Sequence, residues 1–165
     1  MSFKELTDNI VALHHSFLRR ELPDITSRLE NLSVELEASE KITEAQNLFR
    51  KIRNKIEAHL KDEETLLFPT GSALELGEIP PESDIDLLER LVEMEKEHEN
   101  CGNALRLLSQ MLMDMPVSTI QAKVLDSVRN LSCDMDEHVR KENEEVHPRF
   151  LALMKARSSQ AAGCG

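Results

Sequence analysis

The chain has 165 residues, enough for one domain with its own core, and its composition of 40% hydrophobic and 31% charged residues is typical of an ordered globular protein. A formal net charge of −11 argues against binding to nucleic acid or to an anionic membrane, and no apolar run approaches the roughly 18 residues of a membrane span. With five Phe, no Trp and no Tyr, the core must consist of Leu, Ile, Val and Met, and we predict an all-α fold.

The first half of the chain predicts two helices. Apolar side chains recur at helical spacing from Leu6 to Leu36, and the pattern continues past Pro23. A second run with the same spacing follows Ser39 and extends to Leu66, which predicts the second helix. Residues that commonly interrupt helices then predict a break in the chain: Pro69, Gly71 and Gly77.

A loop with the sequence GEIPPESD separates the two halves of the chain. Its Pro and Gly residues are typical of a turn, and Ser83 or Asp84 is the candidate N-cap of the helix that follows. The apolar spacing predicts that this third helix extends from about Ile85 to Met113.

The fourth predicted helix begins at Pro116 or Ser118 and continues to Met154. Residues 158–165 have no apolar pattern, so we expect a flexible tail there. Four long helices with short connections are typical of an up-down-up-down bundle. We therefore predict a single four-helix domain over residues 1–157.

Four histidines occupy positions in the apolar rows where an aliphatic side chain is expected. They are His15, His59, His98 and His138, one on each predicted helix. A buried imidazole without a partner costs a few kcal/mol, so each needs a hydrogen bond or a metal ion. A single core histidine is usually just hydrogen-bonded, but four of them, one per helix, favour a shared site.

Two segments, HLKDEETLLFP and HVRKENEEVHP, repeat one sparse pattern of His, three residues, Glu, five residues and Pro. Residues i and i+4 lie on the same face of a helix. Each His–Glu pair, His59 with Glu63 and His138 with Glu142, can therefore supply two ligands to one metal site. The chain thus consists of two hairpins that each supply one His from the first helix and a His–Glu pair from the second. The proline that ends each pattern predicts that the helix stops or bends there.

Four imidazoles and two carboxylates in an apolar interior are typical of a metal site. These ligands suit Fe, Mn or Zn, and carboxylates from two different helices can bridge two ions. A structural zinc site is more often closed by four ligands, frequently Cys. The remaining alternative is a metal-free bundle whose histidines are simply hydrogen-bonded.

Four segments resemble the hemerythrin-like, HHE-type cation-binding domain: HHSFLRRELP, HLKDEETLLFP, MEKEHENCG and HVRKENEEVHPRFL. The resemblance spans roughly residues 8–155 and is closest to the di-iron repair-of-iron-centres branch. It implies two non-haem iron ions, bridged by carboxylate and oxo groups. The ligands it implies are His15, His59, Glu63, His98, His138 and Glu142; His15 is chosen over His14 because it sets the H-x-x-L-R spacing of this branch.

The resemblance implies a protein of the nitrosative or oxidative stress response that repairs iron–sulfur centres or supplies their iron. Its partners would be iron, O2 or NO, and an iron–sulfur protein. Two alternatives stay open: an O2- or NO-binding carrier or sensor without turnover, and a di-iron oxidase or peroxidase, for which Cys101 is a candidate participant. A nucleic acid or a membrane is not expected as a partner.

Three further residues lie near the predicted ligands. His14 is flanked by apolar residues, His147 stands where relatives commonly carry Phe, and Cys101 follows His98 by one helical turn. For each of them, packing or hydrogen bonding is the simpler interpretation, and a role at the site is the alternative.

The cysteine pattern indicates the cellular compartment in which the protein works. Cys101, Cys133 and Cys164 form neither a CxxC pair nor an even disulfide set, and the N-terminus lacks the basic and apolar regions of a secretory signal. We therefore expect a reducing, cytoplasmic environment.

Overall fold

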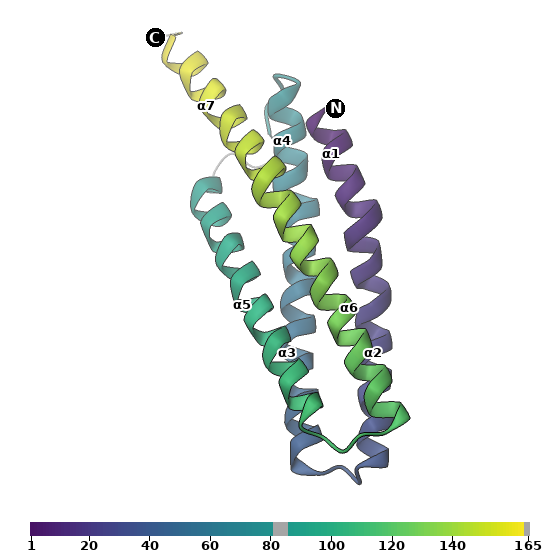
Figure 1. Ribbon diagram of the computed structural model, residues 1–165. Helices are drawn as coiled ribbons and strands as arrows, with labels where there is room; N and C mark the ends of the chain where they lie inside the picture. Colours follow the sequence, from purple (N-terminus) through teal and green to yellow (C-terminus); the bar gives the residue numbers. More distant parts are fainter. Residues whose placement is uncertain (81–85, 164–165) are drawn as a thin grey trace.

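The structure is a computed structural model that describes residues 1–80 and 86–163, and it confirms the all-α prediction. The described residues form helices and connections, with no strand among them. Four long helical rods make up the bundle (Figure 1). Rod 1 consists of α1 (Phe3–Ile10), the π-helical turn η1 (Val11–His15) and α2 (Ser16–Glu35), and rod 2 consists of α3 (Glu40–Asp62), the π-helical turn η2 (Glu63–Leu67) and α4 (Phe68–Glu75). Rod 3 is the single helix α5 (Leu87–Met113). Rod 4 consists of α6 (Thr119–Lys141), the π-helical turn η3 (Glu142–Val146) and α7 (His147–Gly163).

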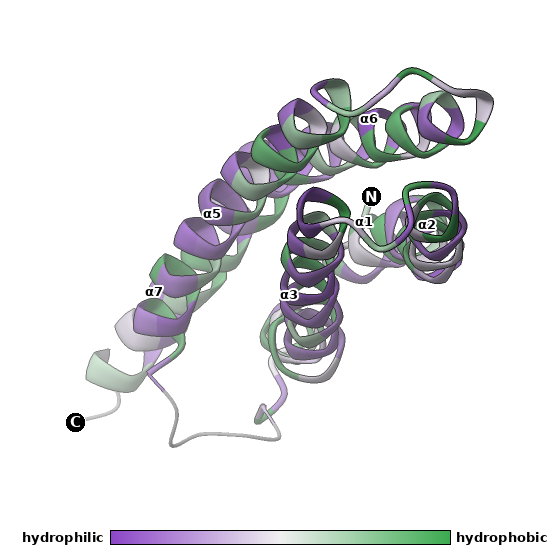
Figure 2. Cartoon of the chain, turned by 90° about the horizontal axis from the view of Figure 1, so that it is seen from below, coloured by the Kyte–Doolittle hydropathy of each residue, from purple (hydrophilic) through white to green (hydrophobic). Residues whose placement is uncertain are grey.

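The rods pack in the predicted up-down-up-down order. The connections from α2 to α3 and from α5 to α6 lie at one end of the bundle, and both termini lie at the other (Figure 1). Each long helix contacts two neighbours: α2 packs against α3 and α6, and α5 packs against the same two helices. Figure 2 shows this arrangement from the end that carries the connections.

The start of α6 agrees with the predicted capping, whereas α5 has an N-cap that was not predicted. Ser118 is the N-cap of α6, and its Oγ accepts a hydrogen bond of 3.0 Å from the backbone N–H of Gln121. Asp86 caps α5 in the same way, accepting from the N–H of Glu89 at 3.1 Å. The predicted N-caps Ser83 and Asp84, and the predicted start at Ile85, lie outside the described residues.

The predicted break at Pro69 and Gly71 is wrong. Rod 2 continues through both residues to Glu75 and ends before Gly77, whose φ of 72° is the left-handed conformation that glycine adopts readily. Gly71 is instead a packing residue inside α4, because a Cβ at this position would lie 2.2 Å from Cε1 of Phe3. The turn that ends the rod therefore comes about two helical turns later than the sequence pattern suggested.

Proline is tolerated in rod 2 because of the π-helical turn that precedes it. The backbone N–H of Phe68 bonds to the carbonyl of Glu63, five residues back, and Pro69 follows directly. The same arrangement recurs in rod 4, where Pro148 follows His147. Because the helical hydrogen-bond pattern is already irregular here, the missing N–H of proline interrupts little.

The interior contains two apolar clusters, one on each side of the polar residues described below. The cluster nearer the connections, called the connection-side cluster, draws on α2, α3, α5 and α6 and includes Leu22, Ile56 and Leu105. The terminus-side cluster is smaller and packs Phe3, Phe68 and Phe150 with their neighbours. Both are built from the apolar rows that the sequence pattern identified.

The end of rod 4 extends beyond the packed region. Helix α7 continues to Gly163, and its side chains from Lys155 onwards are exposed. The domain boundary at residue 157 and the flexible tail after it stay predictions. No described helix combines the length and the apolar character that crossing a bilayer needs.

Candidate metal centre

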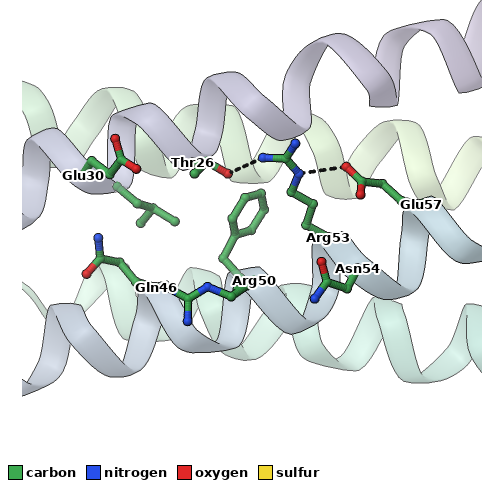
Figure 3. A pocket seen from close by; sticks show the side chains of 9 residues that line it. Thr26, Glu30, Gln46, Arg50, Arg53, Asn54 and Glu57 are labelled. Atoms are coloured by element: carbon green, nitrogen blue, oxygen red, sulfur yellow. Dashed lines mark hydrogen bonds and ion pairs between the residues drawn. The ribbon is translucent and has the colours of Figure 1, made fainter.

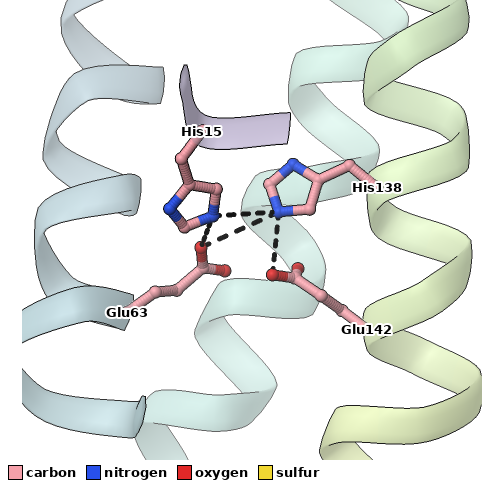
Figure 4. A group of neighbouring side chains, drawn as sticks. All are labelled: His15, Glu63, His138 and Glu142. Atoms are coloured by element: carbon pink, nitrogen blue, oxygen red, sulfur yellow. Dashed lines mark hydrogen bonds and ion pairs between the residues drawn. The ribbon is translucent and has the colours of Figure 1, made fainter. Parts of the chain in front are cut away.

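The six residues predicted as metal ligands lie together in the bundle interior and form two overlapping groups. His15, Glu63, His138 and Glu142 make the first group, which Figure 4 shows, with ligand atoms within 4.8 Å of one another. His59 and His98 make the second group with the same two carboxylates, again within 4.8 Å. All six side chains are buried. We call these groups site 1 and site 2.

Each site takes one histidine from each helical hairpin. In site 1 the Nε2 atoms of His15 and His138, from rods 1 and 4, are 3.3 Å apart. In site 2 the Nε2 atoms of His59 and His98, from rods 2 and 3, are 2.7 Å apart. The interior thus joins the two hairpins through both sites, rather than giving one site to each hairpin.

The two carboxylates offer one oxygen to each site. Oε1 of Glu63 lies 2.6 Å from Nε2 of His59, and Oε2 lies 3.2 Å from Nε2 of His15. In Glu142, Oε1 lies 2.8 Å from Nε2 of His138, and Oε2 lies 3.1 Å from Nε2 of His98. This is the arrangement that lets both carboxylates bridge two ions.

Three of the six ligand positions coincide with π-helical turns. His15 is the last residue of η1, while Glu63 and Glu142 are the first residues of η2 and η3. Such turns widen a helix locally and are frequent at functional sites. Rod 3, which supplies His98, is α-helical over Leu87–Met113. Sequence reasoning missed these turns; the proline six residues after each glutamate is the signal that could have indicated two of them.

Hydrogen bonding leaves the two carboxylates incompletely satisfied. Both oxygens of Glu63 and Oε2 of Glu142 accept no hydrogen bond from the described residues, although imidazole nitrogens approach them within 3.2 Å. Of the four carboxylate oxygens, only Oε1 of Glu142 has a hydrogen-bond partner, Nε2 of His138 at 2.8 Å. Buried carboxylate oxygens without a hydrogen bond are costly, and groups that converge without bonding fit ligands of a common ion. The donor set therefore fits two cations.

The charges in this interior shift the ionisation of its groups. Burial lowers the pKa of His98, but the carboxylates of Glu142 and Glu63 outweigh it and raise the pKa to about 9. Burial raises the pKa of Glu63, yet His59, His15 and His98 together hold it well below its usual range. Protons on the imidazoles thus balance the carboxylates when no cation does, and metal binding must displace them.

Two outer carboxylates orient one histidine in each site. Glu64 lies 2.7 Å from Nδ1 of His15 and accepts two hydrogen bonds from Arg19, at 2.8 and 3.0 Å. Glu97 lies 2.6 Å from Nδ1 of His59 and accepts a bond from Arg90 at 3.0 Å. A carboxylate on Nδ1 leaves Nε2 facing the interior as a ligand atom.

Sequence reasoning missed both of these outer partners. Glu64 directly follows Glu63, and Glu97 directly precedes His98. Acidic neighbours are frequent in a chain this rich in glutamate, so adjacency to a ligand is a weak signal.

His14 is an outer neighbour of site 1. Its ring stacks on His138 with centroids 5.4 Å apart and an interplanar angle of 4°. The Lys141 ammonium donates to its Nε2 at 3.0 Å, so the Nδ1–H donates to Asp134, also at 3.0 Å. His14 belongs to neither site, and its hydrogen bonds agree with the simpler interpretation.

His147 takes the corresponding place beside site 2. Its ring stacks on His98 with centroids 6.2 Å apart and an interplanar angle of 3°. Its Nδ1 lies 3.4 Å from Glu95, but neither ring nitrogen forms a hydrogen bond with the described residues. Burial lowers the pKa of His147, which keeps this ring neutral next to the site.

A hollow between α2 and α3 contrasts with the metal centre. Its volume is about 280 Å³, and polar side chains surround it (Figure 3). Arg53 donates to Thr26 at 3.1 Å and to Glu57 at 2.8 Å, so its charged group is already paired. None of the lining residues belongs to site 1 or site 2. The hollow therefore has no visible role at the centre.

Comparison with known proteins agrees with this geometry. The profile of the hemerythrin HHE cation binding domain matches residues 6–150, a span that includes all six predicted ligands and the greater part of the four rods. A search of curated proteins gave no match. The matching profile describes the family as a whole and does not single out the repair-of-iron-centres branch. The fold, the paired His–Glu ligands and this match together identify the chain as a member of the hemerythrin HHE cation-binding family.

Proposed function

We propose that this protein is a non-haem di-iron protein with six protein ligands: His15, His59, Glu63, His98, His138 and Glu142. The observation that carries the proposal is the placement of one oxygen of each carboxylate at each site. Two cations between these oxygens would neutralise two carboxylates that are fully buried.

Iron fits the donor set, since imidazole and carboxylate ligands with open positions are typical of non-haem iron. When bound, two iron ions would supply redox chemistry and open coordination positions for a small ligand. The protein residues have other tasks. Glu64 and Glu97 hold the rings of His15 and His59 in place, and the apolar clusters on both sides exclude bulk water.

The activity that we propose is the binding of O2 or NO at this centre, in the response to nitrosative or oxidative stress. Resemblance to the repair-of-iron-centres branch adds a second role, which is supply of iron to damaged iron–sulfur proteins. We propose a cytoplasmic location, because the three cysteines form neither a CxxC pair nor an even disulfide set.

A thiol-dependent peroxidase is less well supported. Burial raises the pKa of the Cys101 thiol to about 11, so this side chain is protonated near neutral pH. The thiolate is the reactive form of cysteine. We therefore expect the Cys101→Ser protein to retain its metal content, and to consume peroxide at the same rate as the wild type.

Metal analysis tests the di-iron proposal. Protein purified under low oxygen is expected to contain about two iron ions per chain, one for each site. Its near-ultraviolet background is low because the chain has no Trp and no Tyr, so iron absorption bands should be visible. Wild-type protein that is folded and takes up no transition metal would overturn the proposal.

Substitution of the shared carboxylates sharpens this test. Glu63→Ala and Glu142→Ala each remove an oxygen from both sites, so the iron content should fall sharply in either variant. Glu144→Ala is the matched control, because Glu144 lies on rod 4 like Glu142 but pairs with Arg140 at the surface. Iron content that is equal in all three variants would contradict the ligand assignment.

A measurement of iron transfer distinguishes iron supply from reversible O2 or NO binding. A protein that supplies iron should lose it to an iron-free acceptor or a mild chelator under reducing conditions. A carrier or sensor should keep its iron and bind O2 or NO reversibly. Absorption spectra recorded during chelator addition and during gas exchange distinguish these outcomes.

A further inference from the structure

Two adjoining cavities lie between α3 and α5, next to site 2. The inner cavity has a volume of about 20 Å³, and both His59 and His98 line it. The outer cavity has a volume of about 110 Å³ and lies one to two helical turns nearer the connections. A cavity needs about 10–15 Å³ to admit one water molecule, so the inner cavity holds one small molecule and no more.

The wall surface of both cavities is mainly apolar, although Glu97 also lines the inner cavity and Lys51 and Asn100 line the outer one. Ile56, Leu60 and Met135 line the inner cavity, and Leu48, Ile52 and Ala104 line the outer one. Apolar cavities of this kind stay dry and bind apolar guests. Met135 adds a flexible side chain that adjusts to an incoming molecule.

Cys101 belongs to the walls of both cavities, and so does Lys55. The Cys101 side chain is buried on α5, one helical turn from His98, and its protonated thiol behaves as a small apolar group. Lys55 is exposed, so its aliphatic stem contacts the cavities while its ammonium group reaches solvent.

We propose that these two cavities form the passage by which small uncharged molecules of the O2 or NO class reach site 2, with Cys101 as the constriction. The inference rests on the proposed function, because it names the route to the same metal centre. Charged ligands should be disfavoured, since most of the wall surface is apolar and offers an ion no partner in exchange for its water. A recess of about 360 Å³ between α5 and α6 also reaches His98, but charged side chains line it, among them Glu99, Arg106 and Asp136, so it lacks the apolar character of this passage.

Xenon tests the passage without any metal chemistry. The full chain is loaded with Zn²⁺, a diamagnetic ion that accepts the same ligands, and methyl NMR spectra are recorded under xenon pressure. We expect shifts at Ile52 and Ile56 and none at Leu32, which lies in the same apolar cluster but lines neither cavity. Unchanged spectra at Ile52 and Ile56 would overturn the proposal.

Association kinetics test the constriction. In the iron-loaded protein, Cys101→Leu should slow NO association on the order of tenfold, because the larger side chain fills the inner cavity. Cys101→Ala should accelerate it. Ala104→Leu fills the outer cavity without touching a ligand and should also slow association. Cys133→Leu, at an exposed position of α6, is the matched control with no expected change.

The two experiments separate failure of the passage from failure of the proposed function. If the wild-type protein binds neither O2 nor NO, the proposed function is wrong, while the xenon shifts still decide whether the passage exists. If NO binds at the same rate in Cys101→Leu, Ala104→Leu and the wild type, and all three have equal iron content, the passage is wrong and the di-iron function stands.

Discussion

The two ends of the bundle are built differently. Towards the connections, four long helices enclose a large cluster of mainly aliphatic side chains. Towards the termini, the cluster is smaller and relies on three Phe side chains packed around α1, α4 and α7. The metal centre lies between them. The larger cluster towards the connections stabilises the fold by apolar packing, which allows costly buried carboxylates to persist at the centre.

The largest expected effect comes from the connection-side cluster. Leu105 is fully buried there, and Leu105→Ala should lower the free energy of unfolding by about 2–5 kcal/mol. The iron content of the folded variant should not change. Leu107→Ala is the control on the same helix, because Leu107 is 51% exposed. Urea denaturation and metal analysis check the result. A loss of iron in parallel with the loss of stability would contradict the independence of the metal centre from the connection-side cluster.

A smaller effect is expected at the terminus-side cluster. A Cβ at Gly71 would lie 2.2 Å from Cε1 of Phe3, so Gly71→Ala should destabilise the protein by about 1–3 kcal/mol through overpacking. Gly102→Ala is the matched control on α5, where the nearest side-chain atom, from Arg106, is 3.5 Å away. That variant should be about 0.5–1 kcal/mol more stable, because alanine favours the helix. Thermal unfolding distinguishes the two variants, and equal effects would contradict the close packing at Phe3.

The outer carboxylates are expected to affect the centre and not the clusters. Glu64→Gln removes the charge that orients His15, so metal affinity should fall by about 10- to 100-fold. Glu97→Gln should do the same through His59. Glu57→Gln is the control, because Glu57 pairs with Arg53 at the surface. Competition titrations with a metal-binding dye measure the metal affinity. An unchanged affinity in Glu64→Gln would show that Glu64 does not orient His15 for metal binding.

The pH dependence of stability should differ between the metal-free and the iron-loaded protein. In the metal-free form, His98 has a raised pKa of about 9, so its stabilising effect is complete below its unfolded pKa of 6.5 and is lost as pH rises through 9. Glu63 has a lowered pKa, and its contribution is lost only as pH falls below the usual range of a carboxyl group. The metal-free protein should therefore be most stable in mildly acidic solution.

Iron binding displaces the imidazole protons, so the stabilisation that iron provides should grow between pH 6.5 and 9. The expected slope is about 1.4 kcal/mol per pH unit for each proton displaced. Unfolding midpoints measured with and without iron over this range test the prediction. Parallel pH profiles for the two forms would argue against histidine ligation.

The fold and the convergence of the six candidate ligands could be predicted from the sequence because both follow from helical spacing. Leu, Ile and Val rows define four helices, and a histidine in phase with each row marks an interior polar position. The pairing of His15 with His138, and of His59 with His98, was not accessible, because it depends on how the two hairpins face each other. Spacing within a helix carries no information about which helices become neighbours.

The π-helical turns were missed for a different physical reason. Helical periodicity assumes a constant rotation per residue, and one inserted residue changes that rotation only locally. The pattern around Pro69 was therefore taken as the end of a helix when it marks an irregular turn inside a continuous rod. Proline alone does not distinguish these two cases, since it removes one N–H in both.

The prolines after the two π-helical turns η2 and η3, which are wider than an α-helical turn, also restrict where those turns can form. A wide turn in a helix can slide along the chain when successive N–H groups exchange their acceptors. Past Phe68 in rod 2 and past His147 in rod 4, the next residue is proline and has no N–H to exchange. The wide turns therefore cannot move towards the C-terminus from the positions where Glu63 and Glu142 begin them. The backbone should hold both carboxylates at their present height whether or not the metal is bound.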